Sequence, residues 1–318
     1  MCSANFKSLF FLVLTALTLV TGCSKSRQPV TAALPSAQSP AATLKTTNDA
    51  VYRGITFTFD RSLTNEVKGE TIAAVTEGKP SDIVPEHPAF TLVGYPRPRS
   101  MTETDPEIRV FSIAKFKDAM HRASLAMAKN TKPPTQDWAP GVDEEFRVLR
   151  TLLAKQPRSE ELKEFLATAR ASEKNKTDDF PQMPFLPMWE ASQAFFTRPQ
   201  YVNFKNGHGV FFLTQWNVSE TSQVTNDGLE YAFQGMTDDG QFYVDAEFSV
   251  TAPFLPRDKD PEVSAWNDKN YLLPQKSKEY QDYLKPIVAR LQALPAEQYK
   301  PNLNLLEQMI ESMEVHPQ

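Results

Sequence analysis

Residues 201–250 carry the most regular alternation of apolar and polar positions in the chain. From residue 242 to residue 250, every second position is apolar: Phe242, Val244, Ala246, Phe248 and Val250. A period of two is typical of a β-strand that covers a core with one face and shows the other face to water. Residues 210–213 are apolar at every position, which indicates a central strand.

Two dipeptides divide this region into hairpins. Asn206-Gly207 and Asp239-Gly240 each separate two strand-like segments. Asn-Gly and Asp-Gly favour two-residue hairpin turns, because both turn residues need a positive φ. We therefore predict a four-stranded antiparallel meander over 201–250.

Further strands and helices are predicted on both sides of the meander. The strand-like segments are 55–59, 89–95 and 108–116, and the helix-like segments are 117–129, 146–153, 159–169, 277–291 and 304–313. Pro286 predicts a kink or break in its helix, Asn304 is the predicted cap of the final helix, and three prolines make 180–187 irregular. We predict a single α+β domain over 51–316, with an antiparallel sheet built from both halves of the chain and helices packed against it.

The start of the chain has the features of a secretory signal. Lys7 precedes an apolar run from Leu9 to Val20, and the small residue Gly22 follows. This run is shorter than the roughly 20 apolar residues that a transmembrane helix needs. Residues 1–22 are therefore predicted to be a signal peptide.

Val20-Thr21-Gly22-Cys23 resembles the lipobox of bacterial lipoproteins. The resemblance implies cleavage between Gly22 and Cys23, a thioether-linked diacylglycerol on Cys23 and an acylated amine at the new terminus. Several acyl chains give durable membrane attachment. Residues 23–50 would then be a lipidated cysteine and a flexible linker, and the protein would lie in the bacterial cell envelope. Ser24 favours the outer membrane in a Gram-negative host.

Composition narrows the possible partners and the chemistry. The cysteines are Cys2 and Cys23, so the mature domain has no disulfide. The net charge is −5, with no basic stripe for nucleic acid and no polybasic patch for anionic lipid. Attachment to the membrane is therefore expected through the lipid on Cys23.

The sequence contains no complete catalytic or metal-binding motif. The four histidines are not paired at ligand spacing, and Asp258 and Asp260 alternate like calcium ligands without the glycine and distal glutamate of such loops. Ser112-Ile113-Ala114-Lys115 matches an SxxK pattern, but KTG and SDN partners do not occur and Ser112 is predicted to lie mid-strand. We predict no metal, no cofactor and no catalytic residue.

One polar face of the meander remains a candidate. Tyr243, Asp245 and Glu247 share a strand face, and a turn at Asp239-Gly240 would place Gln234 opposite Asp245 and Glu230 diagonal to Glu247. Such a face could hold a cation or an acid–base pair. The more ordinary interpretation is a solvated sheet face.

A second resemblance concerns the fold. The stretch Gly54-Ile55-Thr56-Phe57-Thr58-Phe59, the central antiparallel sheet and the closing helix that ends at Met313 resemble the photosystem-subunit and nuclear-import-factor group of α/β/α sandwiches. No functional residue carries over from that group.

The leading hypothesis is a membrane-anchored envelope lipoprotein that binds a protein partner or stabilises an assembly. The alternative is an envelope hydrolase or a small-ligand-binding protein. A deep, charged cleft with perturbed acids would favour the alternative, whereas an exposed aromatic patch at 180–187 or around Trp266 would favour the protein partner.

Overall fold

The computed structural model describes residues 47–78, 82–96, 104–130, 139–169, 181–187, 191–217, 221–270 and 273–317. The chain from Lys45 to Gln318 forms one compact unit. The predictions for Gly22 and Cys23 fall within residues 1–46 and lie outside the described residues.

The first half of the chain contributes five strands and three helices. They are β1 (Thr47–Tyr52), β2 (Ile55–Asp60), β3 (Glu66–Ile72), β4 (His87–Val93), β5 (Glu107–Ser112), α1 (Ile113–Asn130), α2 (Ala139–Lys155) and α3 (Ser159–Ala169). Strand β1 begins inside the range predicted as linker, and β3 was not predicted.

The second half contains the meander and the closing helices. The elements are β6 (Ser192–Phe204), β7 (Gly207–Asn217), β8 (Glu230–Thr237), β9 (Phe242–Ser249), α4 (Pro261–Asn270), α5 (Lys278–Ala293), the 3₁₀ helix η2 (Ala296–Gln298), α6 (Leu303–Glu311) and β10 (Glu314–Val315). Helix α5 continues through Pro286 without a break. Asn302, and not Asn304, caps α6, because the Asn302 side chain accepts a hydrogen bond from Asn304 N.

An antiparallel sheet of seven strands joins both halves of the chain, in the order β3-β4-β5-β9-β8-β7-β6. The four-stranded meander is confirmed, although β6 begins at Ser192. The two halves meet where β5 pairs with β9, with Arg109 opposite Asp245. Strands β1, β2 and β10 form a second, smaller sheet. The α+β prediction is therefore confirmed.

The two predicted turns have different outcomes. Gly240 has φ of 67° and its N–H donates to Thr237 O at 2.8 Å, so this turn needs glycine, and Gln234 pairs with Asp245 as predicted. The Asn206-Gly207 turn is wrong, because Gly207 already pairs with Phe204 in the ladder. A Cβ on Gly207 would lie 2.2 Å from the Phe204 ring, so close packing explains this glycine.

Asn206 was predicted as a turn residue, but its side chain binds the C-terminal strand. Its side-chain amide donates to Val315 O at 2.8 Å and accepts from Val315 N at 3.0 Å. These two bonds hold the C-terminal strand β10 against the turn between β6 and β7. The residue is therefore used for a contact between distant parts of the chain.

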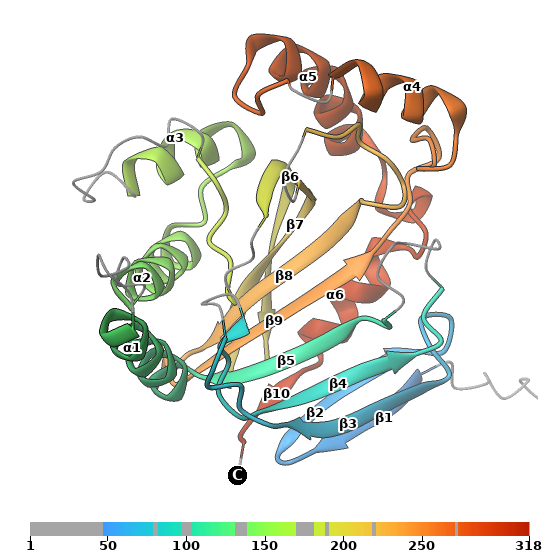
Figure 1. Ribbon diagram of the computed structural model, residues 1–318. Coiled ribbons are helices and arrows are strands. Elements are labelled where there is room, and N and C mark those ends of the chain that lie inside the picture. The colour runs from blue at the N-terminus through green and yellow to red at the C-terminus, as the bar shows by residue number, and fades with distance from the viewer. Residues whose placement is uncertain are drawn as a thin grey trace, which may run out of the picture. The chain divides into compact units, whose positions relative to one another are not determined.

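The large sheet has a hydrophobic core on each face. Figure 1 shows α1, α2 and α3 together on one side of the sheet and α6 on the other. The first core contains Phe111, Phe146, Leu162 and Tyr243, and the second contains Phe211, Phe248, Leu284 and Met309. The prediction that Tyr243 and Asp245 lie on a solvated face is wrong, because both residues have 0% exposure. Helices whose apolar stripes face the sheet cover it here, whereas the alternation alone predicted one wet face.

Candidate functional site

A hollow lies along β6, between α3 and α5. We call it the β6 groove, and its volume is about 540 Å³. Its floor is the strand segment 194–197, and its apolar walls include Leu162 of α3 and Leu284 and Val288 of α5, with Pro181 beside them. Ligand sites in proteins have volumes of about 300–1,000 Å³ and are mostly apolar. The β6 groove meets both conditions.

The polar atoms at one end of the groove bond to each other. Gln292 Oε1 accepts hydrogen bonds from Thr197 Oγ1 at 2.9 Å, from Arg198 N at 2.6 Å and from Ser159 Oγ at 3.3 Å. Arg198 has φ of 53°, a left-handed conformation that is uncommon outside glycine. Gln292 therefore fixes an irregular part of the edge strand and closes this end.

Four charged side chains that line the groove are exposed to solvent, two on each helix, and we call this part of the groove its mouth. Glu160 and Lys163 belong to α3, and Asp282 and Lys285 belong to α5. Lys278 forms an ion pair with Asp282, and Glu160 interacts electrostatically with Arg158. Within the described residues, Lys163 and Lys285 have no carboxylate partner.

A second polar region lies on the sheet face beneath α1–α3. Arg109 of β5 forms a two-pronged ion pair with Asp245, in which Arg109 Nε donates to Asp245 Oδ1 at 3.2 Å and Arg109 Nη2 donates to Oδ2. Burial raises the pKa of Asp245 to about 6, against the opposing effect of Arg109. The carboxyl is therefore ionised at pH 7 and depends on Arg109 for its charge balance.

Two glutamates extend this polar row. Trp216 Nε1 donates to Glu230 Oε2 at 3.0 Å. Burial raises the pKa of Glu230 to about 7, and burial together with the charge of Glu230 raises the pKa of Glu247 well above its usual range. Two carboxyls that repel each other in a half-buried place share a proton near neutral pH. Glu247 Oε1 has no hydrogen-bond partner among the described residues.

The structure brings the four predicted face residues together, and it adds two that the sequence did not indicate. Glu230, Tyr243, Asp245 and Glu247 share a face as predicted, with Gln234 opposite Asp245, and Arg109 and Trp216 complete the row. Tyr243 donates to Leu186 O at 2.8 Å, so the irregular segment 181–187 covers part of this face. Asp245 is fully covered and already paired, which disfavours contact with a substrate. The row is therefore better suited to holding the sheet together than to acid–base chemistry.

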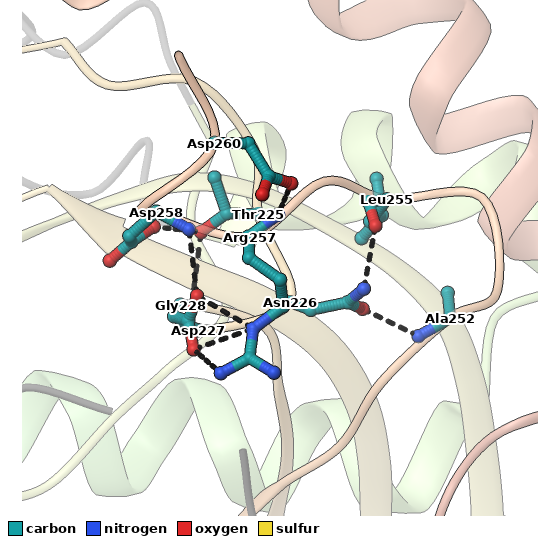
Figure 2. Close-up of polar contacts among 9 residues, drawn as sticks. All are labelled: Thr225, Asn226, Asp227, Gly228, Ala252, Leu255, Arg257, Asp258 and Asp260. Atoms are coloured by element: carbon teal, nitrogen blue, oxygen red, sulfur yellow. Dashed lines mark hydrogen bonds and ion pairs between the residues drawn. The ribbon is translucent and has the colours of Figure 1, made fainter. Parts of the chain in front are cut away.

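Asp258 and Asp260 belong to a network of hydrogen bonds and an ion pair that joins two loops (Figure 2). Asp258 Oδ1 accepts from Thr225 Oγ1 at 2.5 Å, and Asp260 Oδ2 accepts from Arg257 N at 2.7 Å. At the centre, Arg257 Nε lies 2.9 Å from both oxygens of Asp227, which also accepts from Asp258 N. Within the described residues, no group of three His, Cys, Asp or Glu side chains could hold a metal ion.

Replacing Asp227 with alanine is expected to lower the free energy of unfolding by about 1–3 kcal/mol, because Arg257 and Asp258 N lose their acceptor. Although burial opposes ionisation, hydrogen bonds from Arg257 and Asp258 N hold the pKa of Asp227 below its usual value. Urea unfolding at pH 7 measures the effect. Asp268→Ala, an exposed change on α4, serves as the control and should stay within about 0.5 kcal/mol of the unmodified protein. Equal stability of the two variants would contradict the stabilising role of this hydrogen-bond network.

Ser112 does not lie mid-strand as predicted. It is the last residue of β5, α1 begins at Ile113, and Ser112 Oγ accepts from Lys115 N at 3.4 Å. The hydroxyl therefore stands at a helix start, as an SxxK motif requires, but the sequence still has no KTG or SDN partner. The strand prediction ran too far because Ile113 and Phe116 continue the apolar pattern into the helix.

The two places predicted for an exposed aromatic patch are packed. Trp266 contacts the rings of Tyr280 and Tyr283, and Phe185 lies on Trp216 with ring centroids 4.8 Å apart. Among the described residues, the exposed large hydrophobic side chains are Val51, Val75, Val93 and Leu125, which include no aromatic residue. The hollow along β6 is therefore a better candidate for binding than either aromatic region.

Comparison of the chain with family models, with curated proteins and with solved structures finds no match. In the part of the chain that the structure describes, no helix combines the length and apolar character needed to cross a membrane.

Proposed function

We propose that this protein is a lipid-anchored envelope lipoprotein that acts as a binding module, with the β6 groove as its binding site. The observation that carries the binding role is the groove itself, a hollow of about 540 Å³ with apolar walls from two helices and a strand edge. The packed aromatic residues give a flat protein-docking patch no comparable support. The covered, paired state of Asp245 gives hydrolysis none either.

The anchor part of the proposal rests on the lipobox. Cys23 would carry the lipid, and residues 24–46 would connect it to β1. A flexible chain of this length has an average end-to-end distance of roughly 25–30 Å. The linker would therefore hold the binding domain off the membrane while keeping it close to the surface.

The test is native mass spectrometry of the lipidated protein, extracted from its own envelope in mild detergent. The expected mass begins at Cys23 with its acyl chains, plus an added ligand mass. Ala289 is an exposed residue of α5 that lines the groove, so Ala289→Trp should fill the hollow and remove the added mass.

Ala154→Trp is the matched control, because Ala154 is exposed on α2 away from the groove. This variant should keep the ligand. A ligand that remains bound to Ala289→Trp would overturn the groove assignment, and a mass that retains residues 1–22 would overturn the anchor.

A further inference from the structure

The edge of β6 in the groove leaves little room for another β-strand. A strand that adds to a sheet needs a row of unpaired backbone N–H and C=O groups. At one end Gln275 Nε2 already donates to Gln193 O, and at the other end Gln292 Oε1 accepts from Arg198 N. Pro199, the next residue, has no N–H. The open length between these closures is the segment 194–197, which is near the lower end of the usual strand lengths and so allows few ladder hydrogen bonds to an added strand.

The polar side chains inside the groove already form hydrogen bonds within the protein. Thr197, Ser159 and Gln292 bond to one another, and Gln281 Nε2 donates to Gln275 O at 2.9 Å. What remains on the walls is mainly aliphatic, from Leu162, Leu284 and Val288. A polypeptide could bond only to the short open edge of β6 and would leave most of its own amide groups unbonded, whereas an alkyl chain has none to satisfy.

The mouth of the groove adds a preference of charge. Lys163 and Lys285 stand on opposite walls, and neither has a carboxylate partner among the described residues. Of the acidic side chains of the same rim, Asp282 is paired with Lys278, and Glu160 lies near Arg158, whose ion pair is with Glu161. An anionic group at the mouth would complete the charge pattern of the rim.

From these three features, and on the basis of the proposed function, we infer that the β6 groove binds a single-chain amphiphile, with its alkyl chain against Leu162, Leu284 and Val288 and its anionic head between Lys163 and Lys285. The chain gains free energy by leaving water, and the head gains from two cations. The short open edge of β6 and the two lysines, which have no carboxylate partner in the part of the chain that the structure describes, together favour this class of ligand.

The experiment compares three ligands that share a ten-carbon chain: decanoate, decanol and decyltrimethylammonium. The protein is the mature chain, residues 23–318, with Cys23→Ser so that neither lipid nor detergent competes; its cooperative unfolding is checked first. Titration calorimetry below the critical micelle concentrations should rank decanoate first and decyltrimethylammonium last. Decanoate should bind about threefold to tenfold more tightly than decanol at low salt, and this gap should shrink at high salt.

Matched variants locate the two parts of the ligand. The double variant Lys163→Gln and Lys285→Gln should remove the preference for decanoate and keep decanol binding, while the control Lys115→Gln and Lys269→Gln, at exposed lysines outside the groove, should change neither. Octanoate should bind about 16-fold more weakly than decanoate, because each methylene contributes about a factor of four. Ala289→Trp should abolish binding of all the ligands.

The outcomes separate this inference from the proposed function. Equal binding of all three heads, lost in Ala289→Trp, would overturn the anionic preference and leave the groove as the binding site. Failure of every alkyl ligand, while the envelope ligand still depends on Ala289, would overturn the amphiphile and keep the binding module. Alkyl binding that survives in Ala289→Trp would overturn the assignment of the alkyl chain to the groove.

Discussion

Replacing Arg109 with methionine is expected to lower the free energy of unfolding by about 3–5 kcal/mol at pH 8. Asp245 has 0% exposure, and its carboxylate accepts two hydrogen bonds from the Arg109 guanidinium, in a bidentate ion pair. Without Arg109 a buried charge has no partner and must either be neutralised or unfold the sheet around it. Urea unfolding measured at pH 8 and pH 5 gives the effect, which should be smaller at pH 5 because Asp245 can then take up a proton.

Two controls define the source of this loss. Lys68→Met breaks the exposed pair with Glu70 and should change stability by less than about 1 kcal/mol. The double variant Arg109→Met and Asp245→Leu removes both buried charges and should recover most of the loss, because an apolar pair of similar size packs well in this place. If Arg109→Met alone is as stable as the unmodified protein, the pair does not hold β5 to β9.

The second large effect concerns the pH dependence of stability at Glu230 and Glu247. Both carboxyls have a raised pKa in the folded protein, Glu230 to about 7, so the folded state binds protons more tightly than the unfolded state. The stability that these two protonated carboxyls contribute is therefore lost as the pH rises from about 4.5 through 7. Glu247→Gln removes the repulsion and should be more stable than the unmodified protein by about 1–2 kcal/mol at pH 8, after allowance for partial solvent screening.

At pH 4, where both glutamates are protonated in the folded state and mostly protonated in the unfolded state, Glu247→Gln and the unmodified protein should have nearly the same stability. Unfolding by urea at a series of pH values between 4 and 8 tests this. Glu164→Gln, an exposed change on α3, should leave the pH slope as it is. A Glu247→Gln variant with the unmodified slope would show that the two carboxyls do not share a proton.

The alternation of residues 242–250 and the Asp239-Gly240 turn predicted the meander and the register of Gln234 with Asp245 correctly. These are local features, since a strand period and a turn are both encoded within a few residues. The sequence could not give the partner of Asp245, because Arg109 is 136 residues away and only the pairing of β5 with β9 brings them together. The polar face was predicted to be exposed to solvent for the same reason. The helices that cover it are distant in sequence, and the pattern of the strands does not indicate them.

The groove was outside the reach of sequence analysis for a related reason. Leu162, Phe195 and Leu284 line one hollow but belong to three elements that are far apart along the chain. Leu162 and Leu284 fit apolar stripes that are expected to face a core, and their helical spacing was correctly read in that way, whereas no element was predicted at Phe195. Whether three such stripes meet fully or leave a space depends on how α3 and α5 are set against β6, which local patterns do not encode.

The small sheet of β1, β2 and β10 has a consequence for the order in which the chain can fold. Ser312 Oγ accepts from Thr58 N at 2.8 Å across a separation of 254 residues, whereas the β6–β7 and β8–β9 hairpins of the meander close loops of a few residues. Because the entropy lost on closing a loop grows with its length, the hairpins can form early and the junction of β2 with α6 and β10 comes at the greatest entropic cost. Until that junction forms, Ile55, Phe57 and Phe59 have no complete core to enter. Slow closure of this junction would therefore leave an apolar strand open to other chains during folding.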